Sequence, residues 1–236
     1  MRLLIVGDLH ANGSALDAIS ETADDIVVLG DLVDYGPDPG ATVAWVRAHA
    51  SWVVRGNHDH AVAAGAPTGA SSTWADLAEA SASWTRDALS AEERAYLGGL
   101  PLSVTFTFGG ARFAAFHAAP SDPLYRYLPP ETDEATWRSE LEAVHADWLL
   151  LGHTHRPIVR RVGETTIVNP GSVGQPRAGA VGPRGLGRRD GVIHPCLPTR
   201  SWKPRRRSRG RRCCGGRRAL VGCSGDSPGA LRRGPG

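Results

Sequence analysis

Five short apolar segments of this chain each lead to a polar residue that can bind a metal ion. The segment Ile26–Leu29 is rich in β-branched residues, and Gly30 and Asp31 end it. Such a run is typical of a buried strand that delivers one carboxylate to the carboxyl edge of a sheet. The other four segments end in these residues: Asp8, Asn57, His117 and His153. One such ending is common in turns, but five in one chain indicate a shared site.

The side chains at these ends, and next to them, are oxygen or imidazole donors. They are Asp8, His10, Asp31, Asn57, His58, His117, His153 and His155. The set contains two carboxylates, one amide and five imidazoles, and no sulfur. These donors are typical of sites for Mn, Fe, Zn or Ni, and they differ from those of a Cys-rich structural zinc site. About seven donors are too many for one ion and sufficient for two, which in two-metal sites lie roughly 3.5–4 Å apart. We therefore predict two divalent ions.

The chemistry and spacing of this set predict how it is shared between two ions. Asp8 and His10 are separated by one residue, as are His153 and His155, so in extended backbone both side chains of a pair point the same way. A carboxylate can bridge two ions where an imidazole cannot, and Asp31 is the candidate for this role. Two divalent ions against two carboxylates leave a positive site, which favours a phosphate-bearing substrate.

The motifs around these residues resemble, in order, the five motifs of the calcineurin-like metallophosphoesterases. They are Gly7-Asp8-Leu9-His10, Gly30-Asp31-Leu32-Val33-Asp34, Gly56-Asn57-His58-Asp59, Phe116-His117 and Gly152-His153-Thr154-His155, and Asn169-Pro170-Gly171-Ser172 resembles a further stretch of the bacterial branch. A single Asp-x-His is a weak signal, whereas five ordered motifs over residues 1–177 are specific. The resemblance implies an α/β fold: a four-layer αββα sandwich of two mixed β-sheets flanked by helices.

The resemblance also implies a role for each site residue. The first metal would be bound by Asp8, His10 and His155, the second by Asn57, His117 and His153, and both by Asp31. His58 would act on the leaving-group oxygen as a proton donor or contact the phosphate, with Asp59 holding its ring. A hydroxide bridging the metals would attack phosphorus in line.

Departures from related branches narrow the substrate class. The protein serine/threonine phosphatases and symmetrical diadenosine tetraphosphatases usually have Arg where this chain has Tyr35, and Glu where it has Asp59; Ala11 replaces their usual Gly. The bacterial phosphodiesterase-like branch fits better, so we expect a phosphodiesterase that acts on a nucleotide or another small phosphoester. The candidate substrate contacts are Asn12, Tyr35, Tyr125, Arg126 and Tyr127. For the loop residues, a surface or packing role is an equal alternative.

Other functions stay open on the sequence alone. A protein serine/threonine phosphatase or a dinucleoside-polyphosphate hydrolase would use the same ligands. A non-catalytic protein with a degenerate metal site is a second class, and the filled ligand positions argue against it. Nucleic-acid binding would use the Arg-rich part of the chain.

The charge of the chain changes near residue 178. Residues 1–177 contain 12 Arg and no Lys against 22 acidic residues, a net charge of −10, whereas residues 178–236 contain 14 Arg and one Lys against two Asp, a net charge of +13. The second segment also holds all four cysteines and has no sustained apolar periodicity, so it cannot offset the ordering entropy of a fold. We predict a catalytic domain over 1–177 and a largely disordered basic tail over 178–236.

The composition of this tail is that of GC-rich codons read out of frame. We therefore hypothesise a frameshift near residue 178, which would remove the final strands of one sheet and leave its edge uncovered. No apolar run approaches the length of a membrane span. The apolar run after Arg2 has only four residues, which is too short for the hydrophobic region of a signal peptide. We expect a cytoplasmic protein without a membrane partner; the oligomeric state stays open.

Overall fold

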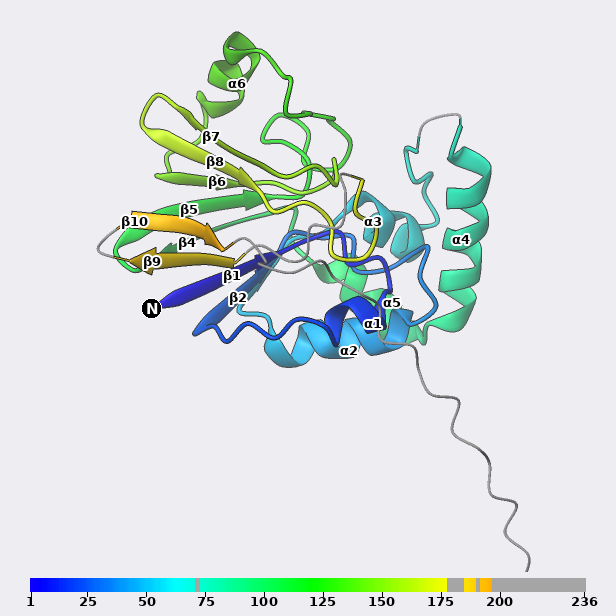
Figure 1. The fold of residues 1–236 in the computed structure, drawn as a ribbon. Coiled ribbons are helices and arrows are strands. Elements are labelled where there is room, and N and C mark those ends of the chain that lie inside the picture. The colour runs from blue at the N-terminus through cyan, green and yellow to red at the C-terminus, as the bar shows by residue number, and fades with distance from the viewer. Residues whose placement is uncertain (71–72, 178–184, 190–191, 197–236) are drawn as a thin grey trace, which may run out of the picture. The chain divides into compact units, whose positions relative to one another are not determined.

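The structure is a computed structural model, and it describes residues 1–70, 73–177, 185–189 and 192–196. In this part of the chain, two five-stranded sheets face each other and helices cover their outer sides (Figure 1). The predicted four-layer αββα sandwich is therefore confirmed. Both sheets mix parallel and antiparallel strands.

The first sheet has the strand order β10-β9-β1-β2-β3, in which β1, β2 and β3 run parallel. Its strands are β1 (Arg2–Val6), β2 (Asp25–Val28), β3 (Trp52–Val53), β9 (Gly185–Arg189) and β10 (Val192–Cys196). Helices α1 (Gly13–Leu16) and α2 (Pro39–His49) make the crossovers between the parallel strands. Because the parallel strands end at one edge, the residues that follow β1, β2 and β3 are brought together there.

The second sheet has the order β4-β5-β6-β8-β7, with β5, β6 and β8 parallel at its centre. Its strands are β4 (Ser103–Phe108), β5 (Ala111–Phe116), β6 (Trp148–Leu150), β7 (Ile158–Val162) and β8 (Thr165–Asn169). The remaining helices are α3 (Asn57–Ala64), α4 (Ala75–Ala88), α5 (Ala91–Gly99) and α6 (Glu134–Leu141). Helix α6 covers the outer face of this sheet (Figure 1), where Trp137 is buried with Leu149 and Ile167.

Successive side chains of β1 point to opposite faces of the first sheet and belong to two different parts of the core. Leu4 and Val6 pack on the helical side with Val43 and Val46 of α2, whereas Leu3 and Ile5 face the other sheet. The inter-sheet core includes a row of stacked rings whose neighbouring centroids lie 3.9, 5.1 and 5.9 Å apart: Trp52, Phe106, Phe113 and Trp148. Apolar packing thus holds the two sheets together beneath the edge where the site lies.

A loop from the second sheet also hydrogen-bonds to the first. The Val173 N–H donates to the Gly7 carbonyl at 3.1 Å, and the Gly174 N–H donates to the Asp8 carbonyl at 3.0 Å. The Ser172 hydroxyl donates to the same Asp8 carbonyl at 2.7 Å. A Cβ added to Gly174 would lie 1.9 Å from the Leu9 carbonyl oxygen, so this approach requires glycine.

The hypothesis that one sheet lacks its final strands does not hold in the described residues, because two strands from the predicted tail extend the first sheet beyond β1. Strand β9 pairs antiparallel with β1, with Leu186 opposite Leu3, and β10 pairs antiparallel with β9. The edge of β1 presents N–H and C=O groups that a further strand can pair, and backbone pairing does not depend on the apolar alternation that we sought. Residues 178–184, 190–191 and 197–236 of the predicted tail lie outside the described residues.

Among the described residues, no helix combines the length and the apolar character that crossing a membrane requires. The long apolar side chains that are most exposed on a helix belong to α4 and the residue before it, namely Trp74, Leu77 and Trp84.

We expect Phe113→Ala to lower the free energy of unfolding by about 3–5 kcal/mol, because it leaves a cavity in the inter-sheet core. Phe113 is 3% exposed and stacks between Phe106 and Trp148. Urea denaturation of the metal-free protein would measure the change. Leu77→Ala is the control, because Leu77 is 53% exposed and should change stability by no more than about 0.5 kcal/mol. Equal effects of the two substitutions would contradict this account of the core.

Candidate metal centre

Most of the candidate site residues have left-handed backbone conformations. The φ angles are 52° at Asp8, 46° at His10, 51° at Asp31, 66° at His153 and 56° at His155. This conformation is uncommon for residues other than glycine, costs about 1–3 kcal/mol each, and clusters at functional sites. The expectation that Asp8 and His10, or His153 and His155, lie in extended backbone was therefore wrong. The loops after the strands turn sharply instead.

The first group of donors comprises Asp8, His10, Asp31 and His155, whose ligand atoms all lie within 4.8 Å of one another. All four residues are buried. The Nδ1 of His10 donates to the Val33 carbonyl at 3.1 Å, and that of His155 donates to the Gln175 carbonyl at 2.7 Å. A carbonyl can only accept, so each Nε2 is left with its lone pair facing the centre of the group.

The second group comprises Asp31, His117 and His153, again with ligand atoms within 4.8 Å of one another. His117 Nδ1 donates to the Leu29 carbonyl at 2.7 Å, which directs its Nε2 into the group. Asn57 Oδ1 lies 2.9 Å from His117 Nε2 and 3.1 Å from His153 Nδ1. The amide oxygen of Asn57 is therefore a fourth donor of this group.

Asp31 belongs to both groups. Its Oδ2 lies 3.8 Å from His10 Nε2 in the first group and 3.3 Å from His117 Nε2 in the second. Gly56, the residue before α3, lies so close to Asp31 that no side chain fits at this position. A Cβ at Gly56 would lie 2.1 Å from Asp31 Oδ1. The structure thus gathers all seven residues that we predicted as metal ligands, in the two predicted sets; their binding of metal stays a prediction.

The chemistry of these donors fits divalent cations. Asp8 Oδ2 is buried and has no hydrogen-bond partner among the described residues, and burial raises the pKa of the Asp8 carboxyl to about 7. The Nε2 atoms of His10 and His155 face each other at 3.0 Å. A buried carboxylate oxygen without a donor and two opposed nitrogen lone pairs are stabilised by a cation placed between them.

Burial and Asp31 decide the charges of the imidazoles. Burial lowers the pKa of His153 to about 3 and that of His155 to about 4, so both rings are neutral. Burial acts in the same direction on His117, but Asp31 beside it raises the pKa of His117 to about 9 overall. In the metal-free protein, the His117 imidazolium therefore compensates the Asp31 carboxylate.

The carboxylate that holds the His58 ring is that of Asp34. His58 Nδ1 lies 2.7 Å from Asp34 Oδ2, and Asp34 is fully buried. The expectation that Asp59 holds this ring was wrong, because Asp59 instead accepts from the N–H groups of Leu32 at 2.8 Å and Gly56 at 2.9 Å. Asp59 is thus the capping residue at the start of α3, whose first turn carries Asn57 and His58.

Tyr35 and Tyr127 border the two groups of donors. The ring centroid of Tyr35 lies 5.0 Å from that of His10 and 4.9 Å from that of His58. The ring of Tyr127 lies 5.7 Å from that of His153, on the side of the second group. Burial and the charge of Asp31 raise the pKa of Tyr35 to about 12, so its phenol stays neutral and can donate a hydrogen bond.

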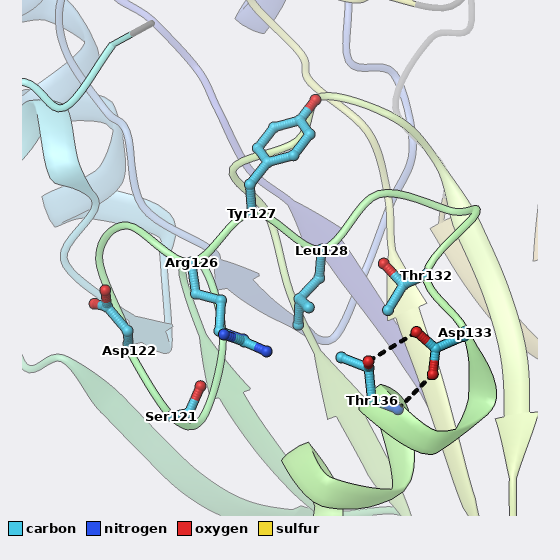
Figure 2. A pocket seen from close by; sticks show the side chains of 8 residues that line it. All are labelled: Ser121, Asp122, Arg126, Tyr127, Leu128, Thr132, Asp133 and Thr136. Carbon is cyan, nitrogen blue, oxygen red and sulfur yellow. Dashed lines mark hydrogen bonds between the residues drawn. The ribbon is translucent and has the colours of Figure 1, made fainter.

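Two other candidate substrate contacts have partners elsewhere. Asn12 Oδ1 accepts from the Ala15 N–H and its Nδ2 donates to the Gly174 carbonyl, both at 3.0 Å. Arg126 Nε pairs with buried Glu140 at 2.6 Å. Figure 2 shows the Arg126 side chain directed into a pocket beside α6, whereas the Tyr127 hydroxyl points out of it. The structure does not support Asn12 or Arg126 as substrate contacts. Tyr125 packs over Gly69 in the loop before α4.

The sequence analysis did not single out Arg177, an exposed cation whose charge reaches Tyr35 and His155. Burial and then the charge of Arg177 lower the pKa of His155, whereas at Tyr35 the charge of Arg177 only partly offsets burial and the charges of Asp31 and Asp34, which raise the pKa of Tyr35 overall. The segment that precedes it is fixed at the site, because His155 donates to the Gln175 carbonyl. The stretch Asn169-Pro170-Gly171-Ser172 was the available signal, since Arg177 follows it by five residues.

Comparison with known proteins gives one family and several related structures. Residues 1–184 match the family model described as the calcineurin-like phosphoesterase superfamily domain. The crystal structure of a metallophosphoesterase from Sphaerobacter thermophilus is 31% identical, with a TM-score of 0.64 over 79% of this chain and 82% of that one. An uncharacterised protein of Methanocaldococcus jannaschii is 27% identical in an alignment 198 residues long that covers 75% of this chain and 78% of that protein. A hypothetical protein from Pyrococcus horikoshii shares the fold, with a TM-score of 0.70 and 18% identity over 83% of this chain and 87% of that one.

We expect Asp31→Asn to reduce the metal content of both groups, because Asp31 alone belongs to both. His117→Ala should mainly reduce the content of the second group. Mass spectrometry of protein reconstituted with Mn²⁺ would measure bound metal per chain. Asp87→Asn, an exposed carboxylate on α4, is the control and should leave the content unchanged. An Asp31→Asn protein that retained two ions would refute the bridging assignment.

We also expect Mn²⁺ binding to release protons below about pH 9. Burial lowers the pKa of His117, but Asp31 raises it to about 9, so the ring is protonated at pH 7 and must lose a proton to bind metal. Apparent affinity should therefore rise with pH up to about 9. Calorimetry in two buffers of different ionisation enthalpy would count the protons. His145→Gln, at an exposed position, should change nothing, and binding without proton release at pH 7 would contradict the charge state of His117.

Proposed function

The chain belongs to the calcineurin-like phosphoesterase superfamily, and from that premise we propose that it is a metal-dependent phosphodiesterase with two divalent ions. The observation that carries this proposal is the position of Asp31 Oδ2 between two groups of buried donors. When bound, the two ions supply a nucleophilic water of lowered pKa and neutralise charge on the phosphoryl group. Mn²⁺ is our choice for testing, because oxygen and nitrogen donors are mixed in both groups.

The pair Asp34–His58 supplies the proton for the leaving group. Nδ1 of His58 is held by Asp34 at 2.7 Å, which leaves Nε2 to act on the substrate. Burial lowers the pKa of His58, but the charge of Asp31 and the bond to Asp34 raise it overall above its ordinary value. The charge of Asp31 and the bond to Asp34 thus favour the protonated ring, which is the form that a general acid requires.

The charges next to this pair favour a diester over a monoester. A diester carries one negative charge at neutral pH, whereas a monoester carries nearly two. Tyr35, a neutral phenol, occupies the position where the phosphatase branches have a cation, and the exposed Arg177 is a single positive charge whose field reaches Tyr35 and His155. The combination of one cation and a neutral donor supports a diester with a small organic group, such as a nucleotide.

A comparison of two chromogenic esters tests the substrate class. The Mn²⁺-loaded protein should hydrolyse bis(p-nitrophenyl) phosphate with a higher kcat/KM than p-nitrophenyl phosphate. Asp31→Asn is the background control, because it should remove the metal and the activity together. A preference for the monoester would exclude the diesterase proposal, and the absence of metal-dependent hydrolysis of both esters would favour a non-catalytic metal-binding protein.

We expect His58→Ala to keep both ions and to lose about 10²–10⁴-fold in kcat for a diester with an alkyl leaving group. Asp34→Asn should lower kcat in the same direction because it removes the carboxylate that holds the ring. Both losses should shrink for a nitrophenyl leaving group, which needs no proton. Steady-state kinetics with the two esters would measure this difference. Equal losses for both esters would show that His58 binds the phosphate and does not donate a proton.

A further inference from the structure

We infer that helix α4 positions the neighbouring residues Asn57 and His58, through Glu79 on one side and Ser81 on the other. Glu79 acts on the Asn57 amide through Thr68, and Ser81 acts on the His58 ring through Asp34. This inference deepens the proposed function and rests on it. Neither Glu79 nor Ser81 lies in the motifs that point to the metal centre.

The contacts from Glu79 through Thr68 to Asn57, here called the Glu79 arm, fix which end of the Asn57 side chain faces the second donor group. Asn57 Nδ2 donates to the carbonyl of Thr68 at 2.7 Å, and Thr68 is 1% exposed. Glu79 Oε1 accepts from both the N–H of Thr68 at 3.0 Å and its hydroxyl at 3.1 Å. Both donors of Thr68 thus bond one carboxylate, and such charge-assisted bonds are strong ones.

The orientation of an amide decides whether it can bind a cation. With Nδ2 on the Thr68 carbonyl, Asn57 turns its Oδ1 toward His117 and His153. A rotation of the amide by half a turn would place two N–H donors there, and an N–H group cannot bind a metal ion. Because Thr68 lies in the loop that leads to α4, its carbonyl keeps this place only while Glu79 holds the loop.

The Ser81 arm reaches the other residue of the pair. The Ser81 hydroxyl accepts from the Tyr35 N–H at 2.6 Å and lies 3.3 Å from Asp34 Oδ1, to which it donates. The other oxygen of Asp34 holds His58. Asp34 and Tyr35 both have left-handed backbone, with φ of 74° and 64°, so their turn depends on outside partners.

Helix α4 can position both residues because it is itself held against the rest of the protein. Glu79 and Ser81 flank its buried face, which includes Ala78 and Ala82. The helix is also tied to α3, since Arg86 Nη2 donates to the Ala61 carbonyl at 2.7 Å. Helix α3 begins with Asn57 and His58, so one helix supports both residues from two directions.

The first test measures Mn²⁺ binding to Glu79→Ala and Glu79→Gln by calorimetry, with no use of activity. Glu79→Ala should weaken the second ion by about 10–100-fold, the usual effect of losing a residue that orients a ligand, and leave the first ion unchanged. Glu79→Gln keeps an acceptor oxygen and should bind within about threefold of the natural protein. Asp87→Ala, an exposed carboxylate of the same helix, is the matched control.

Three results would overturn the Glu79 arm. They are natural affinity for both ions in Glu79→Ala, equal weakening of both ions, and a loss in Glu79→Gln as large as that in Glu79→Ala. Because these are binding measurements, they decide the role of Glu79 even for a protein that hydrolyses no ester, in which case the proposed function fails separately.

The second test asks whether Ser81→Ala acts on proton donation without affecting metal. It should bind both Mn²⁺ ions with unchanged affinity, lose about tenfold in kcat for a diester with an alkyl leaving group, and lose little for a nitrophenyl leaving group. Ser81→Thr, which keeps a hydroxyl, should restore most of the loss. Ser83→Ala, at an exposed position of the same helix, is the control. A loss of equal size for both esters, or a weakened ion, would overturn the Ser81 arm.

Discussion

The rest of the structure depends on the burial of two carboxylates, Asp8 and Asp31, among imidazoles at the edge where the sheets meet. An ionised carboxylate cannot leave water without a compensating charge or donor. Asp31 has both in the metal-free protein, from the His117 imidazolium and the His58 N–H. Asp8 has fewer, because one of its oxygens has no partner in the described part of the chain. The site is therefore suited to cations, and the packed sandwich keeps its donors out of water.

Backbone carbonyls decide how the imidazoles are used. Those of Val33, Leu29 and Gln175 each accept from one Nδ1 and thereby leave the opposite nitrogen of the ring for the centre. All three carbonyls belong to strand ends or to loops that follow them, so the sheet edge orients the ligands as well as carrying them. The left-handed residues have the same origin, because a chain that leaves a strand and turns at once must adopt such angles.

The clustering of the seven predicted metal ligands could be found from the sequence, because parallel strands bring their carboxyl ends together whatever the side chains do. Contacts that depend on rotamers and loop paths could not. Asp34 and Asp59 are both close to motif residues along the chain, and only the three-dimensional path shows that Asp34 holds His58 while Asp59 caps α3. The left-handed angles at Asp8 and His10 were hidden for the same reason, since a spacing of two fits extended and turned backbone alike. Pairing of β9 with β1 uses main-chain groups, which no side-chain pattern reveals.

The division of the donors between the sheets has a further consequence. Asp8, His10, Asp31 and Asn57 follow strands of the first sheet, whereas His117, His153 and His155 follow strands of the second. Bound ions would therefore join the two sheets at the edge where the carboxyl ends of their parallel strands meet. Each ion that binds only to the folded chain would raise the free energy of unfolding by RT ln(1 + [M]/Kd), where [M] is the concentration of free metal. The melting temperature of this protein would then rise with the concentration of free metal ions.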